Sequence, residues 1–201
     1  MKQRSSVMNG IPTRKEEVIR VAERLFAVKG YHATTLDEIA EEIGVTKPAL
    51  YYYINSKEDI LRSIINRILE PMNEVIQVGE SYASPREKMA RIIRILVKFS
   101  AERKETTLIA FEQAKLLPKR SSDVLKRRQE EVEKVVENIL KEGMEKNIFY
   151  VTNTRMACFA ILSVANWVYR WYQPGKMTPD EIADHFINLL ENGYVKPEHR
   201  T

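Results

Sequence analysis

Amine, phenol and hydroxyl side chains gather between residues 34 and 57, in a pattern suited to binding a polyanion. Lys47, the tyrosines at 51–53 and Lys57 all fall within this stretch. Ammonium and phenol groups donate hydrogen bonds to phosphate oxygens, and a lysine in the first turn of a helix can also reach the acceptor atoms of guanine. Side-chain type assigns phosphate contacts to Thr35, Tyr51, Tyr53 and Lys57. The residues placed where a short helix would reach base edges are Lys47, Pro48, Ala49 and Tyr52.

Two short helices joined by a tight turn would hold these side chains in place. Thr35 caps the first helix, and Glu38 three residues later completes a capping box. Gly44 supplies the left-handed residue that ends this helix. Thr46 caps the second helix, where Pro48 is tolerated because an N–H in the first turn has no helical partner. The sequence predicts a helix-turn-helix with the Thr46 hydroxyl facing outward, and a second helix the size of a major groove.

This stretch resembles the DNA-binding domain of the TetR family of transcriptional regulators. The resemblance covers about the first quarter to third of the chain, from Thr13 to roughly Ile65. Five segments carry it: Thr34-Thr35, Ile39-Ala40, Gly44-Val45, Leu50-Tyr51-Tyr52-Tyr53 and Ser56-Lys57. It implies a three-helix DNA-binding domain over residues 1–58, a palindromic double-stranded operator, and repression. The alternative is a solvated helical hairpin whose tyrosines only pack.

The composition indicates a mostly helical chain with a substantial core. Its 201 residues are 44% hydrophobic and 30% charged, with seven glycines and eight prolines. The formal net charge is +4, yet residues 1–60 hold nine Lys and Arg against nine Asp and Glu. Attraction to DNA therefore depends on placement. We expect four acids on the first helix to lie away from the second helix: Asp37, Glu38, Glu41 and Glu42. We expect a positive edge formed by Lys2, Arg4, Arg14, Lys15, Lys47 and Lys57.

The sequence lacks the features of enzymes, metal sites and secreted proteins. Cys158 is the only cysteine, so thiols cannot form a disulfide or a zinc site. The histidines at 32, 185 and 199 lack the spacing of metal ligands, and Gly-rich phosphate loops are absent. The N-terminus lacks the apolar segment of a signal peptide, and the run Met156–Tyr169 is too short to span a membrane. We expect a cytoplasmic protein without a membrane partner, cofactor or enzymatic activity.

Capping signals divide the chain into helices. Residues 1–12 are polar and form either a flexible arm that touches DNA or an unstructured terminus. Thr13 and Glu16 form a capping box that opens a helix, and the helix after Ser56 is expected to kink or break at Pro71. Further helices are predicted over about 85–99, 108–117, 121–145, 153–172 and from 178 onward. The fold class is all-α, with about nine helices.

The last two predicted helices carry a surplus of apolar side chains. The segment 153–172 is apolar almost all round, so it must be covered on both sides. A second copy of the chain would cover it by forming a four-helix interface. TetR-like proteins dimerise through their last two helices, which implies a homodimer here. The residues assigned to its interface are Phe159, Leu162, Ile182, Phe186 and Leu189.

Polar groups stand among these apolar residues and suggest a ligand site. Asn166 with Arg170, and Trp167 with Trp171, are four residues apart and would lie on adjacent strips of a helix. An arginine beside indoles can bind an anionic head group or stack on an adenine. This segment resembles TetR-family regulators of fatty-acid and steroid breakdown that respond to acyl-CoA thioesters. The assigned ligand residues are Phe99, Phe111, Asn166, Trp167, Arg170 and Trp171. Packing of both tryptophans in the core or the dimer interface is the alternative.

The hypothesis is a ligand-responsive transcriptional repressor with two domains. Residues 1–58 would bind operator DNA, and residues 59–201 would dimerise and bind a small apolar or amphipathic effector, with a fatty acyl-CoA as the candidate. Two alternatives stay open: a helical adaptor that dimerises without a ligand response, and a regulator of multidrug or lipophile efflux.

Overall fold

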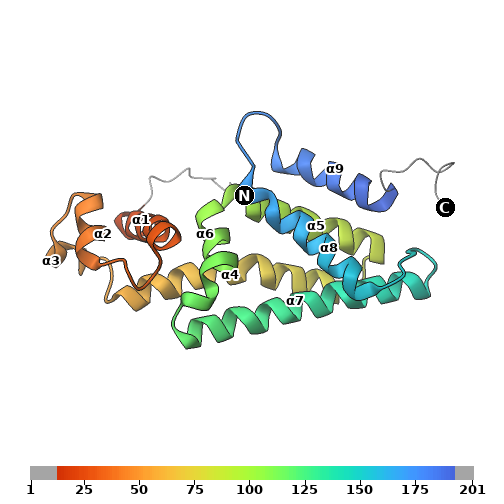
Figure 1. Ribbon diagram of the computed structural model, residues 1–201, viewed down its shortest axis with the longest axis horizontal. Helices are drawn as coiled ribbons and strands as arrows, with labels where there is room; N and C mark the ends of the chain where they lie inside the picture. The colour runs from red at the N-terminus through yellow and green to blue at the C-terminus, as the bar shows by residue number, and fades with distance from the viewer. Residues whose placement is uncertain (1–12, 193–201) are drawn as a thin grey trace, which may run out of the picture. The chain divides into compact units, whose positions relative to one another are not determined.

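The computed structural model describes residues 13–192, which form helices and no β-strand (Figure 1). Nine α-helices, one π-helical turn and two 3-10 turns follow one another in this range. The all-α fold class with about nine helices is thus confirmed. The predicted N-terminal arm, residues 1–12, and His199 lie outside the described residues. Within the described range, no helix is long and apolar enough to cross a lipid bilayer.

The chain divides into two compact units between Ile64 and Ile65, a point that falls inside helix α4 (Lys57–Glu80). The first unit holds the predicted helix-turn-helix. Besides the beginning of α4, it contains α1 (Arg14–Lys29), α2 (Leu36–Ile43) and α3 (Lys47–Leu50), and α2 and α3 form the helix-turn-helix. Their buried side chains form one apolar core, which includes Val18, Ala22, Phe26, Ile39, Ala40, Leu50, Ile54, Ile60 and Ile64.

Side-chain caps fix where the first two helices begin. The Thr13 hydroxyl accepts the backbone N–H of Glu16, and the Thr35 hydroxyl accepts that of Glu38 at 3.2 Å. In both boxes the glutamate reaches back to the N–H of the capping threonine. Gly44 ends α2 in the left-handed region, with φ of 75°. These capping boxes and the Gly44 turn confirm the prediction made from residue types alone.

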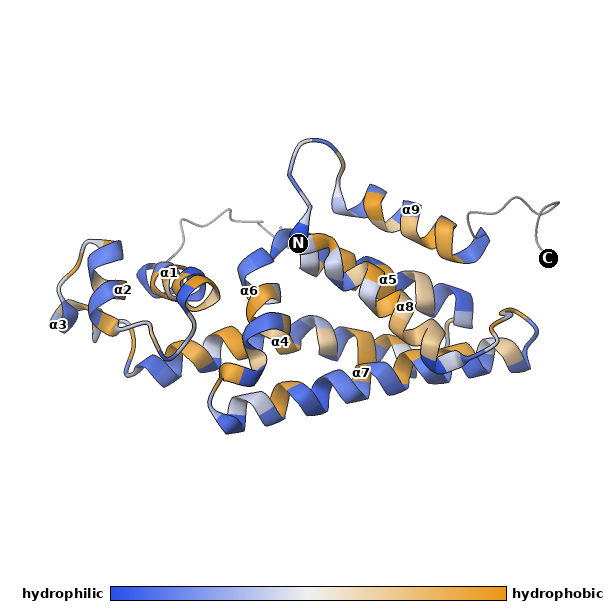
Figure 2. Ribbon diagram, viewed as in Figure 1, coloured by the Kyte–Doolittle hydropathy of each residue, from blue (hydrophilic) through white to orange (hydrophobic). Residues whose placement is uncertain are grey.

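The second unit is built around α5, which packs against α7, α8 and α9 (Figure 1). Its helices after α4 are α5 (Pro85–Glu102), α6 (Lys104–Leu108), α7 (Lys119–Glu145), α8 (Thr154–Asn166) and α9 (Pro179–Asn192). A π-helical turn, Ile109–Gln113, follows α6, and 3-10 turns cover Ala114–Leu116 and Trp167–Arg170. Figure 2 shows apolar residues concentrated on α5 and α8 and long hydrophilic stretches along α7. The apolar faces of α5 and α8 therefore meet in the interior of this unit.

Ion pairs join the helices of this unit at its surface. Arg86 of α5 makes two contacts of 2.8 Å with Glu191 of α9. Lys88 of α5 pairs with Glu142 of α7 at 3.2 Å and is only 7% exposed. Exposed pairs contribute little to stability because water screens them, whereas a mostly buried pair is screened less. The Lys88 pair therefore ties α5 to α7 more firmly than the exposed pairs do.

Pro71 does not break α4, although the sequence suggested a kink or a break there. The helix runs without interruption to Glu80. Proline removes one hydrogen bond from a helix interior. Met72 and Val75 on the same helix are buried, so tertiary packing holds the helix together on the C-terminal side of Pro71.

The helix predicted over residues 153–172 ends earlier than expected. α8 stops at Asn166, and a 3-10 turn follows. The buried Ser100 hydroxyl of α5 causes this change: it donates to the Asn166 carbonyl at 2.9 Å and accepts the Tyr169 N–H at 3.0 Å. A continuing α-helix would need both backbone groups for itself. The predicted four-residue strips through Trp167 and Arg170 are therefore wrong, because these residues lie in a tighter turn.

Gly44 provides a test of the helix-turn-helix geometry. Gly44→Ala should destabilise the turn by roughly 1–2 kcal/mol, because an L-residue is strained in the left-handed region. No heavy atom lies within 4 Å of the added Cβ, so the cost comes from the backbone alone. Gly44→Asn should cost less, since asparagine tolerates this conformation. Amide hydrogen exchange in α2 and α3 measures the difference; equal protection in glycine, alanine and asparagine forms would contradict it.

Candidate nucleic-acid interface and effector cavity

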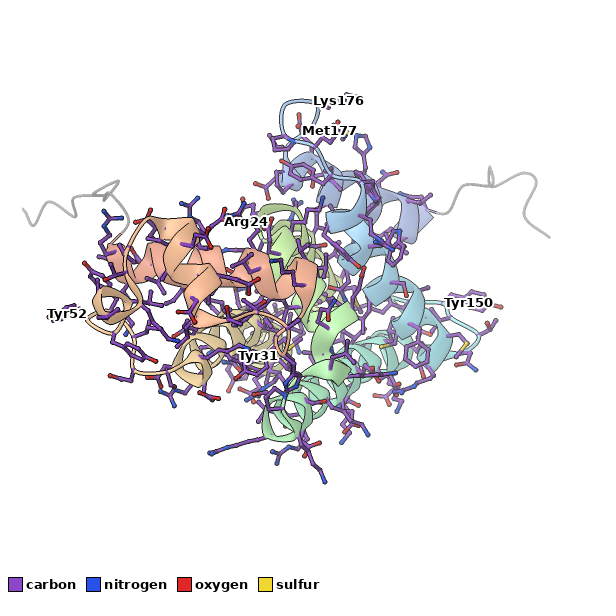
Figure 3. The ribbon with its side chains drawn as sticks, turned by 60° about the vertical axis from the view of Figure 1, so that its left-hand side comes forward. Arg24, Tyr31, Tyr52, Tyr150, Lys176 and Met177 are labelled. Atoms are coloured by element: carbon purple, nitrogen blue, oxygen red, sulfur yellow. The ribbon has the colours of Figure 1, made fainter. Side chains whose placement is uncertain are left out.

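The short helix α3 is held in place by one buried side chain and by one side-chain cap, and its other face is exposed. Leu50 is completely buried, which seats the helix on the core of its unit. The Thr46 hydroxyl accepts the backbone N–H of Ala49 at 3.3 Å and begins the helix. Tyr51 and Tyr52 then lie exposed, Tyr52 by 88%. Figure 3 shows Tyr52 at the outer edge of its unit, pointing away from the helices.

Lys47, the first residue of α3, contacts α2. Its ammonium donates to the Asp37 carboxylate across 2.9 Å, and this hydrogen bond raises the pKa of Lys47. The expectation that all four acids of α2 lie away from α3 is wrong for Asp37, because the tight turn at Gly44 brings the beginnings of the two helices together. Because its pKa is raised, Lys47 stays charged throughout the physiological pH range.

Two other acids of α2 are paired with cations of α1. Lys29 contacts Glu38 across 2.8 Å, and Arg24 contacts Glu42. The bond from Lys29 is the largest cause that lowers the pKa of Glu38, to about 2. Together with the pair between Lys47 and Asp37, these pairs neutralise three of the four acids of α2.

Lys57 lies against an aromatic cluster at the start of α4. Its ammonium is 4.3 Å from the centre of the Tyr31 ring and 5.9 Å from that of Phe26. Burial lowers the pKa of Lys57, and burial together with Glu58 raises the pKa of Tyr31 to about 12. The Tyr31 hydroxyl donates to Glu58 at 3.3 Å. The cluster thus restrains a lysine that the sequence assigns to a phosphate contact.

The remaining residues of the predicted DNA surface differ in exposure. Thr35 and Pro48 are exposed, whereas Ala49 and Tyr53 are half-buried. The Thr35 hydroxyl is engaged in its capping box with Glu38. The first unit therefore brings Lys47, Tyr51 and Tyr52 to solvent together at α3.

A cavity of about 420 Å³, partly open to solvent, lies in the second unit. Its wall combines residues of α4, α5, the π-helical turn, α7, α8 and the following 3-10 turn. The lining side chains are Ile68, Pro71, Met72, Leu96, Phe99, Phe111, Gln129, Val132, Glu133, Phe159, Leu162, Ser163, Asn166, Trp167 and Tyr169. Four residues assigned to the ligand are among them: Phe99, Phe111, Asn166 and Trp167.

Other assigned residues fall elsewhere. Arg170 and Trp171 are not part of this lining, whereas Phe159 and Leu162, assigned to the dimer interface, are. Trp171 instead packs edge-to-face against Phe186 of α9, with ring centres 6.3 Å apart. On α9 itself, Ile182 is buried and Leu189 is 44% exposed.

A polar network borders the cavity. The Tyr169 hydroxyl donates to Glu112 at 2.7 Å, and Arg170 contacts the same carboxylate oxygen at 3.3 Å. The Arg170 guanidinium also lies 5.1 Å from the centre of the Trp167 ring. Burial, followed by the bond to Glu112, raises the pKa of Tyr169 to about 12.

Sequence reasoning missed the roles of Tyr169 and Glu112. Glu112 is a carboxylate directly after the apolar run 108–111, which was the available signal. It lies in the π-helical turn beside Phe111, and such turns often occur at functional sites. Among the described residues, no group of three or more His, Cys, Asp and Glu side chains is arranged to hold a metal ion.

A helix-turn-helix unit followed by a helical unit with a cavity defines a DNA-binding regulator. Two family models match the chain: "Bacterial regulatory proteins, tetR family" over residues 18–64, and "Tetracyclin repressor-like, C-terminal domain" over residues 82–194. The chain belongs to the TetR family of transcriptional regulators. Proteins of this family that resemble it are regulators rather than enzymes.

Relatives extend over nearly the whole chain. The transcriptional repressor KstR2 of Mycolicibacterium smegmatis is 24% identical over 190 residues, 92% of this chain and 93% of the relative. A TetR/AcrR-family regulator from Thermobifida fusca is 31% identical, with a TM-score of 0.67 over 91% of this chain and 99% of the other. AibR, solved with isovaleryl coenzyme A and operator DNA, is 22% identical with a TM-score of 0.70, covering 88% and 97%. The AibR likeness shows the fold alone.

Tyr169 permits a pH test of the polar network. Because its folded-state pKa is raised, its contribution to stability is present below pH 10 and is lost as the pH rises towards 12. Tyr169→Phe should lower the stability by about 1–3 kcal/mol at neutral pH, the value of a hydrogen bond to a charged group. It should also flatten the alkaline loss seen by circular dichroism. Tyr150→Phe, at a tyrosine 93% exposed, is the control; identical alkaline curves for all three proteins would exclude the effect.

Proposed function

We propose that this regulator is a repressor that a coenzyme A thioester releases from its operator, with the acyl group in the cavity of the second unit. The observation that carries the proposal is the apolar cavity of about 420 Å³. Its volume falls in the usual range of ligand pockets, about 300–1,000 Å³. An apolar wall with few polar groups favours an acyl chain over a hydrophilic ligand.

The polar groups of this wall suit the thioester end of such a ligand. Asn166 and Ser163 offer an amide and a hydroxyl beside the apolar part of the lining. Arg170 is half-exposed beside Trp167 and contacts Glu112, so an anionic head group outside the cavity would compete with Glu112 for it. The complex of AibR with isovaleryl coenzyme A supports this ligand class for a protein of similar fold.

A regulator of lipophile efflux is less well supported. Cationic lipophiles would need an unpaired carboxylate in the wall. The carboxylate of Glu133 is paired with Arg155 at 2.9 Å. An acyl thioester requires no such group, so we favour it.

DNA binding is assigned to residues 1–58, with Thr35, Thr46 and Lys57 as supporting contacts around α3. A homodimer through α8 and α9 would present two α3 helices to a palindromic operator, about one DNA turn apart. Exposed Phe159 of α8 and Leu189 of α9 support a partner subunit on these helices. The effector would favour a dimer geometry in which the two helices no longer match the half-sites.

The experiment that tests the proposal measures operator affinity with a panel of coenzyme A thioesters. Wild-type protein should bind duplex DNA from its own upstream region and lose affinity when a thioester of suitable length is added. Val132→Phe places a ring in the cavity wall and should remove the response while sparing DNA binding, because Val132 lines the cavity. Val151→Phe, outside the lining, should respond normally. Release of wild type and Val132→Phe alike would argue against the cavity, and no release by any thioester would reject the ligand class.

Tyr52 offers a test of the DNA surface. Tyr52→Ala should weaken operator binding at least tenfold and leave the dimer intact, because the side chain is 88% exposed and supports no core contact. Gel-shift titration and analytical ultracentrifugation give the two quantities. Tyr82→Ala, which removes an equally exposed tyrosine from the second unit, is the matched control. Wild-type affinity in Tyr52→Ala would contradict the proposed docking of α3.

A further inference from the structure

Asp37 and Lys47 both lie in the first turn of a helix of the helix-turn-helix. Asp37 lies in the first turn of α2, and Lys47 is the first residue of α3. Their carboxylate and ammonium are 2.9 Å apart, yet the two side chains remain 66% and 46% exposed. Both groups are therefore held together and remain accessible to a ligand.

The charge of Asp37 needs an explanation, because a carboxylate near DNA repels phosphates. Glu38 and Glu42, on the same helix, are neutralised by cations of α1. Asp37 is instead paired with Lys47 of α3, the helix proposed to enter the major groove as the recognition helix. N-terminal residues of recognition helices contact base edges. A carboxylate within hydrogen-bonding distance of such a residue comes close to the same base pair.

The remaining hydrogen-bonding capacity of the pair matches one base pair. An ammonium has three N–H donors, and one is used by Asp37, so two remain. A carboxylate keeps free lone pairs on both oxygens after accepting one bond. In the major groove, a G·C pair presents the N7 and O6 acceptors of guanine next to the N4 donor of cytosine. The two free N–H donors of Lys47 and the acceptor oxygens of Asp37 therefore complement the two acceptors of guanine and the donor of cytosine.

We propose that Asp37 and Lys47 act as one unit that reads a G·C base pair in each operator half-site. Lys47 donates to guanine N7 and O6, and Asp37 accepts from cytosine N4. The inference rests on the proposed operator binding and adds a base preference to it. It makes Asp37 a specificity-determining residue.

An A·T pair is a poorer match for the same two side chains. The N6 amino group of adenine is a donor and lies where guanine has the O6 acceptor. The Lys47 ammonium could still donate to adenine N7, but it would face the N6 amino group, which is a donor like itself. A phosphate is a poorer match still, because Asp37 would repel it.

The test begins with operators selected by the wild-type protein from duplex DNA with a randomised core. Every base pair of a selected half-site is then changed singly, and affinities are measured for the wild type, Asp37→Ala, Asp37→Asn and Lys47→Gln. Wild-type protein should lose about five- to hundredfold at one G·C position, the usual effect of a mismatched base pair. Asp37→Ala and Lys47→Gln should lose discrimination at that position alone. Asp37→Asn, which keeps an acceptor oxygen, should retain part of it.

Glu41→Gln is the matched control, since it removes one negative charge from the same helix at an exposed position that has no ion pair with any residue of the described range 13–192. It should change affinity for all duplexes alike. The proposal is overturned if Asp37→Ala behaves as this control does, raising affinity uniformly, or if the position that responds prefers A·T. Selection of no duplex by the wild type would overturn the proposed function, and the inference with it. Circular dichroism of each variant verifies folding.

Discussion

The hydroxyl of Ser100 bonds to the backbone where α8 ends, and one wall of the cavity depends on this contact. It is completely buried on α5, where it donates to the carbonyl of Asn166 at the end of α8 and accepts the N–H of Tyr169 in the following 3-10 turn. The chain consequently leaves the α-helix at Asn166, and the 3-10 turn places Tyr169 against Glu112. Because a buried hydroxyl bonded on both sides cannot shift without leaving polar groups unpaired, this corner of the cavity is rigid.

Much of the fold was predictable from the sequence because its signals are local. Capping boxes at Thr13, Thr35 and Ser84 specify where helices begin, and each is present in the structure. The end of α8 was not predictable, because it depends on a serine 66 residues away in the chain. Continuity of α4 past Pro71 likewise depends on packing, which opposes the local preference of proline.

The candidate sites were predictable to different degrees. Exposure of Tyr51 and Tyr52 follows from the helical register that buries Leu50, and register can be read from residue spacing. The contact between Lys47 and Asp37 could not be read in this way, since it depends on the angle between two helices. The π-helical turn that holds Phe111 and Glu112 has no sequence signature of its own, so the polar border of the cavity was visible only in three dimensions.

Internal neutralisation of α2 has a consequence for how this protein behaves on a chromosome. Sequence-independent binding to DNA comes almost entirely from cations that displace counterions. A unit whose acids and bases balance, nine against nine over residues 1–60, gains little from this source. Bulk chromosomal DNA then competes weakly for the regulator, and more of it stays free to sample sites by diffusion.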